Sequence, residues 1–138
     1  MKHIATLLFT FLVFGCANSI SKETLDNLNG YWEIAEVEFS NGQRKTYTIN
    51  PSVDYIELKE MKGFKKKMQP KFDGTYDTSN DAEHFILLEK EGVFLFSYKN
   101  DLSEWEEQII ALEENSFSII NEENITYTYK RYEPIKIE

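Results

Sequence analysis

From Gly30 onward, the chain is a series of short runs rich in strand-forming residues, and each run ends in residues that favour turns. The expected strands span residues 31–39, 44–49, 53–60, 70–77, 84–90, 93–99, 105–112, 116–120 and 125–132. Consecutive strands usually pair, and connections this short leave no room for the helical crossovers of a parallel sheet. The sequence therefore predicts an all-β fold, an antiparallel up-and-down barrel of about eight or nine strands.

Three segments between these strands carry their own predictions. Asn41-Gly42 is a strong hairpin signal, because both residues tolerate positive φ. The lysine-rich segment 61–68 is expected to form a loop or the tip of a hairpin, and residues 78–81 are expected to form a turn. The run around Gly74 reads as a bulged or kinked strand, since glycine inside a strand often marks a bend.

The first fifteen residues have the pattern of a secretory signal. A tip containing Lys2 is followed by the apolar run 4–14, and Gly15 ends the segment. The apolar run is shorter than the roughly 20 residues that a membrane-spanning helix needs. The segment is therefore expected to be removed, and it takes no part in the fold.

Cys16, the only cysteine of the chain, follows this signal directly. The segment Val13-Phe14-Gly15-Cys16 resembles the bacterial lipobox, although Phe14 is bulkier than the usual residue at its position. The resemblance implies lipidation of Cys16 and cleavage before it. Several acyl chains make a stable membrane anchor, whereas one chain alone is marginal. The alternative is a plain signal peptide with an incidental cysteine.

These features divide the chain into four parts. Residues 1–15 are the expected signal peptide, and 16–27 are the lipidated N-terminus with a short tether. Residues 28–132 form one barrel domain, and 133–138 form a C-terminal tail. The formal net charge of −9 argues against nucleic-acid binding, which needs a basic surface. Aromatic residues make up 14% of the chain, which excludes a disordered acidic tail.

The first strand opens with a recognisable motif. Gly30-Tyr31-Trp32 resembles the Gly-x-Trp signature of the lipocalins, and the whole chain resembles the small lipocalin-like lipoproteins of Gram-negative bacteria. In that family the tryptophan closes one end of the barrel, and an arginine of the last strand packs over its ring. The resemblance implies barrel-closing structural roles for Gly30, Trp32 and Arg131, without contact to a ligand. It carries over no ligand chemistry.

The sequence contains no arrangement typical of a catalytic or metal site. After the signal is removed, His84 is the only histidine, so the usual multi-histidine or cysteine zinc sites cannot form. No nucleophile elbow and no glycine-rich phosphate loop is present. Carboxylate pairs such as Glu106-Glu107 point to opposite faces of a strand. We therefore expect no catalytic residue, metal or cofactor, and a binding protein rather than an enzyme.

Two functions fit this architecture. The first is a membrane-anchored module that binds a small hydrophobic molecule inside the barrel, in a cavity lined by aromatic side chains. The candidate cavity residues are Tyr76, Phe94, Phe96, Phe117, Tyr127 and Tyr129. The volume of the barrel interior decides this reading, since a ligand needs a cavity of about 300 Å³ or more.

The alternative is a filled barrel that docks on an envelope complex. The runs 85–88 and 93–96 are apolar on both faces, so their outer faces need a cover. The segment before Gly30, a partner protein or the membrane surface are the candidate covers. The lysine-rich segment is a second candidate docking site, for lipid headgroups or an acidic partner. Because Ala17 rather than aspartate follows Cys16, the anchor is expected in the outer membrane, with the domain facing the periplasm or the cell surface.

Overall fold

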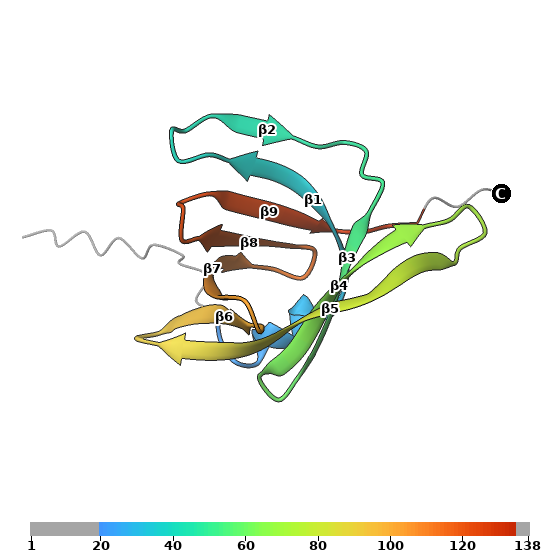
Figure 1. The fold of residues 1–138 in the computed structure, drawn as a ribbon. Helices are drawn as coiled ribbons and strands as arrows, with labels where there is room; N and C mark the ends of the chain where they lie inside the picture. Colours follow the sequence, from blue (N-terminus) through green and yellow to red (C-terminus); the bar gives the residue numbers. More distant parts are fainter. Residues whose placement is uncertain (1–19, 135–138) are drawn as a thin grey trace, which may run out of the picture.

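The structure is a computed structural model, and it describes residues 20–134 apart from the side chains of Ser79 and Asn80. The expected signal, Cys16 and residues 135–138 lie outside the described residues. A 3₁₀ helix, η1, precedes nine strands (Figure 1). The elements are η1 (Thr24–Leu28), β1 (Gly30–Glu38), β2 (Arg44–Thr46), β3 (Val53–Lys59), β4 (Lys62–Pro70), β5 (Tyr76–Lys90), β6 (Val93–Lys99), β7 (Glu104–Leu112), β8 (Ser116–Asn121) and β9 (Thr126–Arg131).

The strands form one closed antiparallel sheet. Its order is β2-β1-β3-β4-β5-β6-β7-β8-β9, and β1 pairs with β9 to close the barrel. Strands β2 and β3 lie along the same edge of β1, because β2 pairs with Glu36–Glu38 and β3 pairs with Gly30–Trp32. They act as one interrupted strand, so the barrel counts as eight-stranded. The predicted all-β up-and-down barrel is confirmed.

The interruption between β2 and β3 follows from the residues that join them. Pro51 cannot donate a ladder hydrogen bond, and Asn50 precedes it. Side-chain and turn contacts bridge the gap: Asn50 Nδ2 donates to the carbonyl of Ile34 (2.9 Å), and the amide of Tyr47 donates to the carbonyl of Ala35 (2.9 Å). The β2–β3 linker therefore stays attached to β1 while it leaves the barrel wall.

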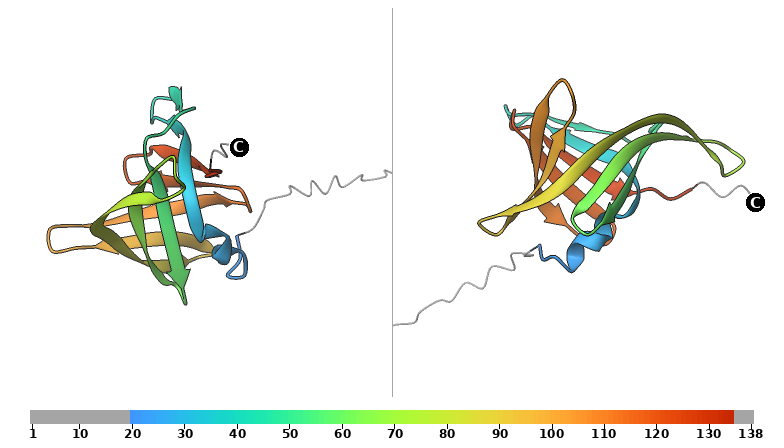
Figure 2. Two further views of the ribbon diagram at one scale, coloured as in Figure 1. Left: turned by 90° about the vertical axis from the view of Figure 1, so that its right-hand side faces the viewer. Right: turned by 60° about the horizontal axis from the view of Figure 1, so that its bottom comes forward.

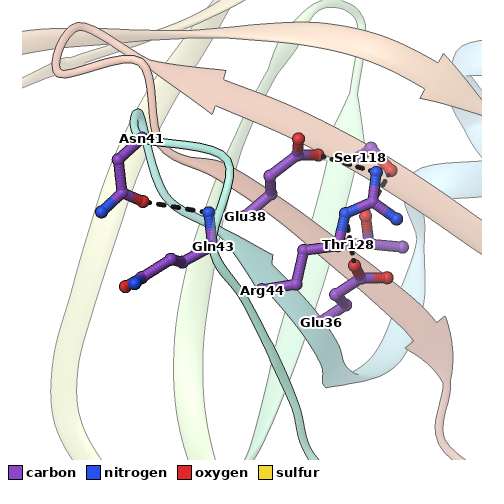
Figure 3. Close-up of polar contacts among 7 residues, drawn as sticks. All are labelled: Glu36, Glu38, Asn41, Gln43, Arg44, Ser118 and Thr128. Carbon is purple, nitrogen blue, oxygen red and sulfur yellow. Dashed lines mark hydrogen bonds and ion pairs between the residues drawn. The ribbon is translucent and has the colours of Figure 1, made fainter.

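The β1–β2 hairpin is held by polar contacts on its surface (Figure 3). Arg44 lies between Glu36 and Glu38, with Nε 3.4 Å and Nη2 3.6 Å from their carboxylate oxygens. At the turn, the Asn41 side chain accepts a hydrogen bond from the amide of Gln43 (3.0 Å). Exposed ion pairs of this kind contribute little stability, about 0–1 kcal/mol each. The predicted Asn41-Gly42 turn is present between the two strands.

The predictions for residues 61–81 were wrong. Apart from Met61, the lysine-rich segment 61–68 lies in strand β4 and not in a loop, and residues 78–81 lie inside the long strand β5 and not in a turn. The β3–β4 turn is made by Glu60 and Met61, both with positive φ (52° and 66°), so no glycine marks it in the sequence. The chain turns again at residues 71–75, where Gly74 has φ of 85°. Residues 70–77 are therefore a hairpin tip and not a kinked strand.

One end of the barrel is closed by η1 (Figure 2). Leu25 and Leu28 of this helix are 2% and 0% exposed, and they belong to the same hydrophobic cluster as Trp32. Residues 24–27, which the sequence assigns to the tether, thus pack as part of the domain. The indole Nε1 of Trp32 donates to the carbonyl of Leu28 (2.8 Å), which satisfies the one polar atom of the buried ring.

Arg131 ties the last strand to this closed end. Its guanidinium lies over the Trp32 ring, 4.1 Å from the centroid. The same group donates to the carbonyls of Asn27 (2.8 Å), Asn29 (2.9 Å) and Glu114 (2.7 and 3.0 Å). Gly30 has φ of 124°, and a Cβ there would lie 2.5 Å from Arg131 Nη1. Only glycine allows the backbone to approach the guanidinium this closely.

We predict that changes at this contact will destabilise the fold. Trp32→Ala should lower the free energy of unfolding by about 3–5 kcal/mol, as a large buried aromatic leaves a cavity. Arg131→Lys should cost about 1–3 kcal/mol, since lysine keeps the charge but loses the planar fork of donors. Urea denaturation would measure both. Lys130→Arg, on the exposed face of the same strand, is the matched control and should be neutral. Unchanged stability in Trp32→Ala and Arg131→Lys would contradict a barrel-closing role.

Candidate functional site

The interior of the barrel is packed with side chains. The void at its centre has a volume of about 10 Å³, and its lining residues are Asp54, Ile56, Lys65, Phe96, Tyr98, Phe117, Ile119 and Tyr129. A single water needs about 10–15 Å³ measured in this way, whereas ligand pockets have roughly 300–1,000 Å³. The expected ligand cavity inside the barrel is therefore corrected: this interior void accommodates a water molecule and no organic ligand.

Aromatic rings fill the space that a ligand would need. Phe85 packs edge-on against Phe96, with centroids 4.8 Å apart, and Phe117 stacks on Tyr129 at the same distance. Trp32 meets Phe117 edge-on at 4.7 Å. Contacts of this geometry stabilise a core by about 0.5–1.5 kcal/mol beyond the burial of area. A ligand could enter only by separating these pairs.

The six candidate cavity residues are thus distributed over different places. Phe96, Phe117 and Tyr129 line the interior void, Phe94 is buried in the core, Tyr127 packs against the core from a half-buried position, and Tyr76 lies outside the barrel. The sequence did not assign the inward face of the strands, because residues 93–96 are apolar on both faces; the structure places Phe94, Phe96, Phe117 and Tyr129 in the interior. Tyr76 was misplaced because the β4–β5 hairpin bends away from the wall, which periodicity does not reveal.

Charged groups share the interior with the rings. Asp54 is 8% exposed, and its carboxylate lies 3.8 Å from Lys67 Nζ. Lys65 Nζ lies 3.7 Å from Glu83 and 5.4 Å from the centroid of Tyr98. Both lysines come from β4. Lys65 lines the interior void, whereas the side chains of Lys67 and Glu83 are mostly exposed. The segment predicted as a solvated loop therefore supplies one lysine to the interior and one surface partner to Asp54.

Glu107 is the most perturbed carboxyl of this interior. Burial raises the pKa of Glu107, while Lys65 and a hydrogen bond from Tyr98 act in the opposite direction and only partly offset it. Burial also raises the pKa values of Tyr98 and Tyr129, so both hydroxyls stay protonated at neutral pH. Such groups can orient one bound water, but they do not constitute a nucleophile or a base poised beside a substrate.

A second depression, which we call the outer cleft, lies outside the barrel and has a volume of about 370 Å³. It lies between the β2–β3 linker, the β4–β5 hairpin tip and the segment after β9. Its lining residues are Glu33, Thr48, Ile49, Asn50, Pro51, Pro70, Lys71, Phe72, Gly74, Thr75, Tyr76, Tyr132, Glu133 and Pro134. This volume falls in the range of small-molecule sites.

The lining of the outer cleft is apolar at its edges and largely neutral. Ile49 and Phe72 are 88% and 92% exposed. The charges of Glu33 and Lys71 are compensated within the protein, by Lys130 (3.0 Å) and by Asp77 (2.9 Å). The cleft therefore combines an apolar edge with compensated charges, and Glu133 is the one charged residue of its lining that has no ion-pair partner among the described residues. The sequence analysis missed this site, although large hydrophobic residues in turn segments were a visible signal.

The outer face of the β5–β6 hairpin is a third candidate. Ile86 is 47% exposed on β5, and Ile110 is 45% exposed on β7. The segment before Gly30 does not cover this face in the part of the chain that the structure describes. Its helix η1 packs at the closed end, against β3 and β7, with Leu25 and Leu28 in the core. The apolar outer face remains at the surface of the described domain.

Metal sites and membrane-spanning helices are the other features of residues 20–134 that bear on function. No group of three or more His, Cys, Asp or Glu side chains there is arranged to hold a metal ion. None of the helices described is long and apolar enough to cross a membrane. His84 is exposed on β5, where its ring lies 6.1 Å from that of Phe64.

We predict that Glu107→Gln stabilises the protein at pH 7. Because the pKa of Glu107 is raised in the fold, the folded state binds its proton more tightly than the unfolded state does. The penalty for its buried charge is therefore present above the folded pKa and disappears as the pH falls through it. The gain from Glu107→Gln should shrink towards pH 4 in urea denaturation followed across pH. Glu106→Gln, on the opposite face of β7, should show no such trend. A loss of stability in Glu107→Gln at pH 7 would contradict this account.

Comparisons with known proteins bear on the fold. No protein-family model and no curated protein matches the sequence. Among solved structures, apocrustacyanin C1 is 9% identical, with a TM-score of 0.50 over 84% of this chain and 67% of that chain. Apocrustacyanin C2 has the same coverage and TM-score at 10% identity. A lipocalin-like protein from Bacteroides uniformis ATCC 8492 is 10% identical, with a TM-score of 0.48 over 77% of this chain and 99% of that chain. At these identities the likeness concerns the fold alone: the chain is a closed, eight-stranded, lipocalin-like β-barrel.

Proposed function

We propose that this protein is a lipid-anchored binding module of the cell envelope that holds a small apolar molecule in the outer cleft. The observation that carries the proposal is the cleft itself. It has a volume of about 370 Å³, and two of the most exposed hydrophobic side chains, Ile49 and Phe72, stand at its edges. Exposed apolar surface of this kind is costly in water, and it marks binding sites more often than chance.

The ligand class follows from the charges around the cleft. Glu33 and Lys71 already have partners of opposite sign, so a charged ligand would compete with existing ion pairs. Glu133, which also lines the cleft, would repel an anion. Tyr76 stacks on Tyr31, with centroids 4.8 Å apart, and presents an aromatic surface to the cleft. A neutral molecule with apolar or aromatic groups fits this lining best. No group in the cleft has the geometry of a nucleophile with its base, and we expect binding without catalysis.

The proposed lipid anchor determines how the domain is positioned at the membrane. Three residues separate Cys16 from Ile20, where the described domain begins, and the four steps between them span at most about 14 Å. Ile20 packs against the core at the end of the barrel that η1 closes. A lipid on Cys16 would therefore hold the closed end close to the membrane. With Ala17 after the cysteine, we place the anchor in the outer membrane.

Protein docking is a second candidate function, favoured by the filled interior and by the apolar outer face of the β5–β6 hairpin. Ile86 and Ile110 on this face are about half exposed. The surface would suit an apolar patch on another envelope protein. A ligand-binding experiment that includes this face separates the two functions.

The cleft predicts where a neutral apolar dye binds. N-phenyl-1-naphthylamine should gain fluorescence with the full chain, and the double variant Ile49→Ser/Phe72→Ser should weaken its binding at least tenfold. Leu102→Ser is the matched control, because Leu102 is 95% exposed on the β6–β7 turn and lies outside the cleft. If Ile86→Ser abolishes dye binding and the cleft variants do not, the dye binds on the outer face of the β5–β6 hairpin and not in the outer cleft. Binding unaffected by every variant would overturn the proposal.

The anchor is tested separately with Cys16→Ser. This variant lacks the sulfur that accepts the lipid, so it should accumulate uncleaved or leave the membrane fraction, while dye binding by the folded domain stays unchanged. Membrane fractionation and intact-mass measurement would read out both outcomes. A cleaved Cys16→Ser product that remains in the membrane fraction would show that the lipid is not the anchor.

A further inference from the structure

The outer wall of β1, β3 and β4 carries a row of aromatic rings. Tyr31 and Tyr55 are cross-strand neighbours with centroids 4.9 Å apart, and Phe64 follows at 6.1 Å from Tyr55. All three side chains are half-buried, so each contributes both to packing and to the surface. The row begins beside Tyr76 at the outer cleft and ends at a separate depression of about 460 Å³. We call the row with this depression the aromatic band.

Uncompensated lysines surround the far end of the band. Within residues 20–134, four lysines have no carboxylate within ion-pair distance, namely Lys45, Lys59, Lys62 and Lys66. Three of these four lie together at Phe64. Lys59 and Lys62 line the depression with Phe64, and Lys66 Nζ lies 5.7 Å from the centroid of the Phe64 ring.

The arrangement of these lysines costs stability. Lys59 and Lys62 are direct partners in the β3–β4 ladder, and like charges placed opposite each other are destabilising. Most lysines elsewhere in the described chain have acidic partners, in a protein with a formal net charge of −9. Three lysines without acidic partners on one face therefore indicate a binding site for a negatively charged group. Glu57 is the one acid in the lining, and it accepts a hydrogen bond from the Tyr55 hydroxyl (3.4 Å).

We propose that the aromatic band binds an acidic oligosaccharide. The rings offer flat apolar faces to the C–H faces of sugar rings, and their order along the wall suits an extended chain. The lysines complement the carboxylate or sulfate groups of such a chain through charge-assisted hydrogen bonds. Glu57 and the Tyr55 hydroxyl are placed to bond to sugar hydroxyls. A lipid tail would not use the lysines, and a neutral glycan would leave them uncompensated.

This site is independent of the apolar ligand proposed for the outer cleft, since it lies at the opposite end of the ring row. Lys65 and Lys67 on the same strand take no part, because Glu83 and Asp54 are their partners. Gly63 also lines the depression, but a Cβ there would meet the Glu57 carbonyl and the ring of Phe85 in the core. Glycine is therefore required for packing on the inner side of β4, and the lysines and Phe64 lie on the outer side.

The test uses trigalacturonic acid as the probe and maltotriose as its neutral counterpart, titrated by calorimetry into the full chain in a neutral detergent. We expect trigalacturonic acid to bind at least tenfold more tightly than maltotriose. The double variant Lys62→Gln/Lys66→Gln should lose at least tenfold in affinity for the acidic probe. Tyr55→Leu keeps an apolar strand residue but removes the ring, and it should weaken both sugars.

Lys45→Gln is the matched control. Lys45 also lacks a carboxylate partner and also lies over an aromatic ring, 5.0 Å from the centroid of Tyr47, but it belongs to β2, away from the band. The Lys45→Gln substitution should leave the affinity unchanged.

No binding of trigalacturonic acid, or an equal loss of affinity with Lys45→Gln, would overturn the proposal. So would tighter binding of a triglutamate peptide or of vesicles containing phosphatidylglycerol, because the partner would then be an acidic protein or a membrane. Lys62 is exposed and Lys66 is half-buried, so an unchanged melting temperature is required to show that the lysine variants are folded.

Discussion

The contact between the Arg131 guanidinium and the Trp32 ring is the feature on which the rest of the barrel depends. It joins the last strand to the first, and its hydrogen bonds reach the segment before β1 and the β7–β8 turn. An eight-stranded barrel must close on itself to remove its open edges. Here Arg131 contacts both the β1–β9 closure and the segment of η1 that closes one end of the barrel. A single arginine therefore stabilises both features. Gly30 permits it through its positive φ and its missing side chain.

A filled barrel changes where function can reside. The fold is associated with a central cavity, but in this chain paired aromatic rings occupy the centre and leave about 10 Å³. The useful surfaces are consequently on the outside, where the β4–β5 hairpin leaves the wall (Figure 1). That departure creates the outer cleft and brings Tyr76 onto Tyr31. The barrel acts as a rigid frame, and its outer wall presents the candidate sites.

Particular residues show how far sequence reasoning reached. Strand periodicity is a local property and favoured aromatic residues of β6, β8 and β9 as interior candidates, but it could not assign the inward face of β6, where residues 93–96 are all apolar. The structure places Phe94, Phe96, Phe117 and Tyr129 inside the barrel. The same reasoning failed at β4. The tight turn there uses Glu60 and Met61 at positive φ, so the chain reverses without the glycine that marks such turns. Gly63 and the lysines after it then resembled a loop, although pairing with β3 and β5 makes them a central strand.

By itself, the sequence determined the class of fold, the number of strands to within one and the motif at the start of the first strand. These follow from local preferences and short-range patterns, which act before any tertiary contact forms. Only the tertiary structure decided that the interior is full, that Lys65 lines it while Lys62 and Lys66 lack acidic partners beside Phe64, and that Ile49, Phe72 and Tyr132 line one cleft. Each of these depends on contacts between residues far apart in the chain. Packing volume and charge compensation are properties of the assembled barrel, and no single strand carries them.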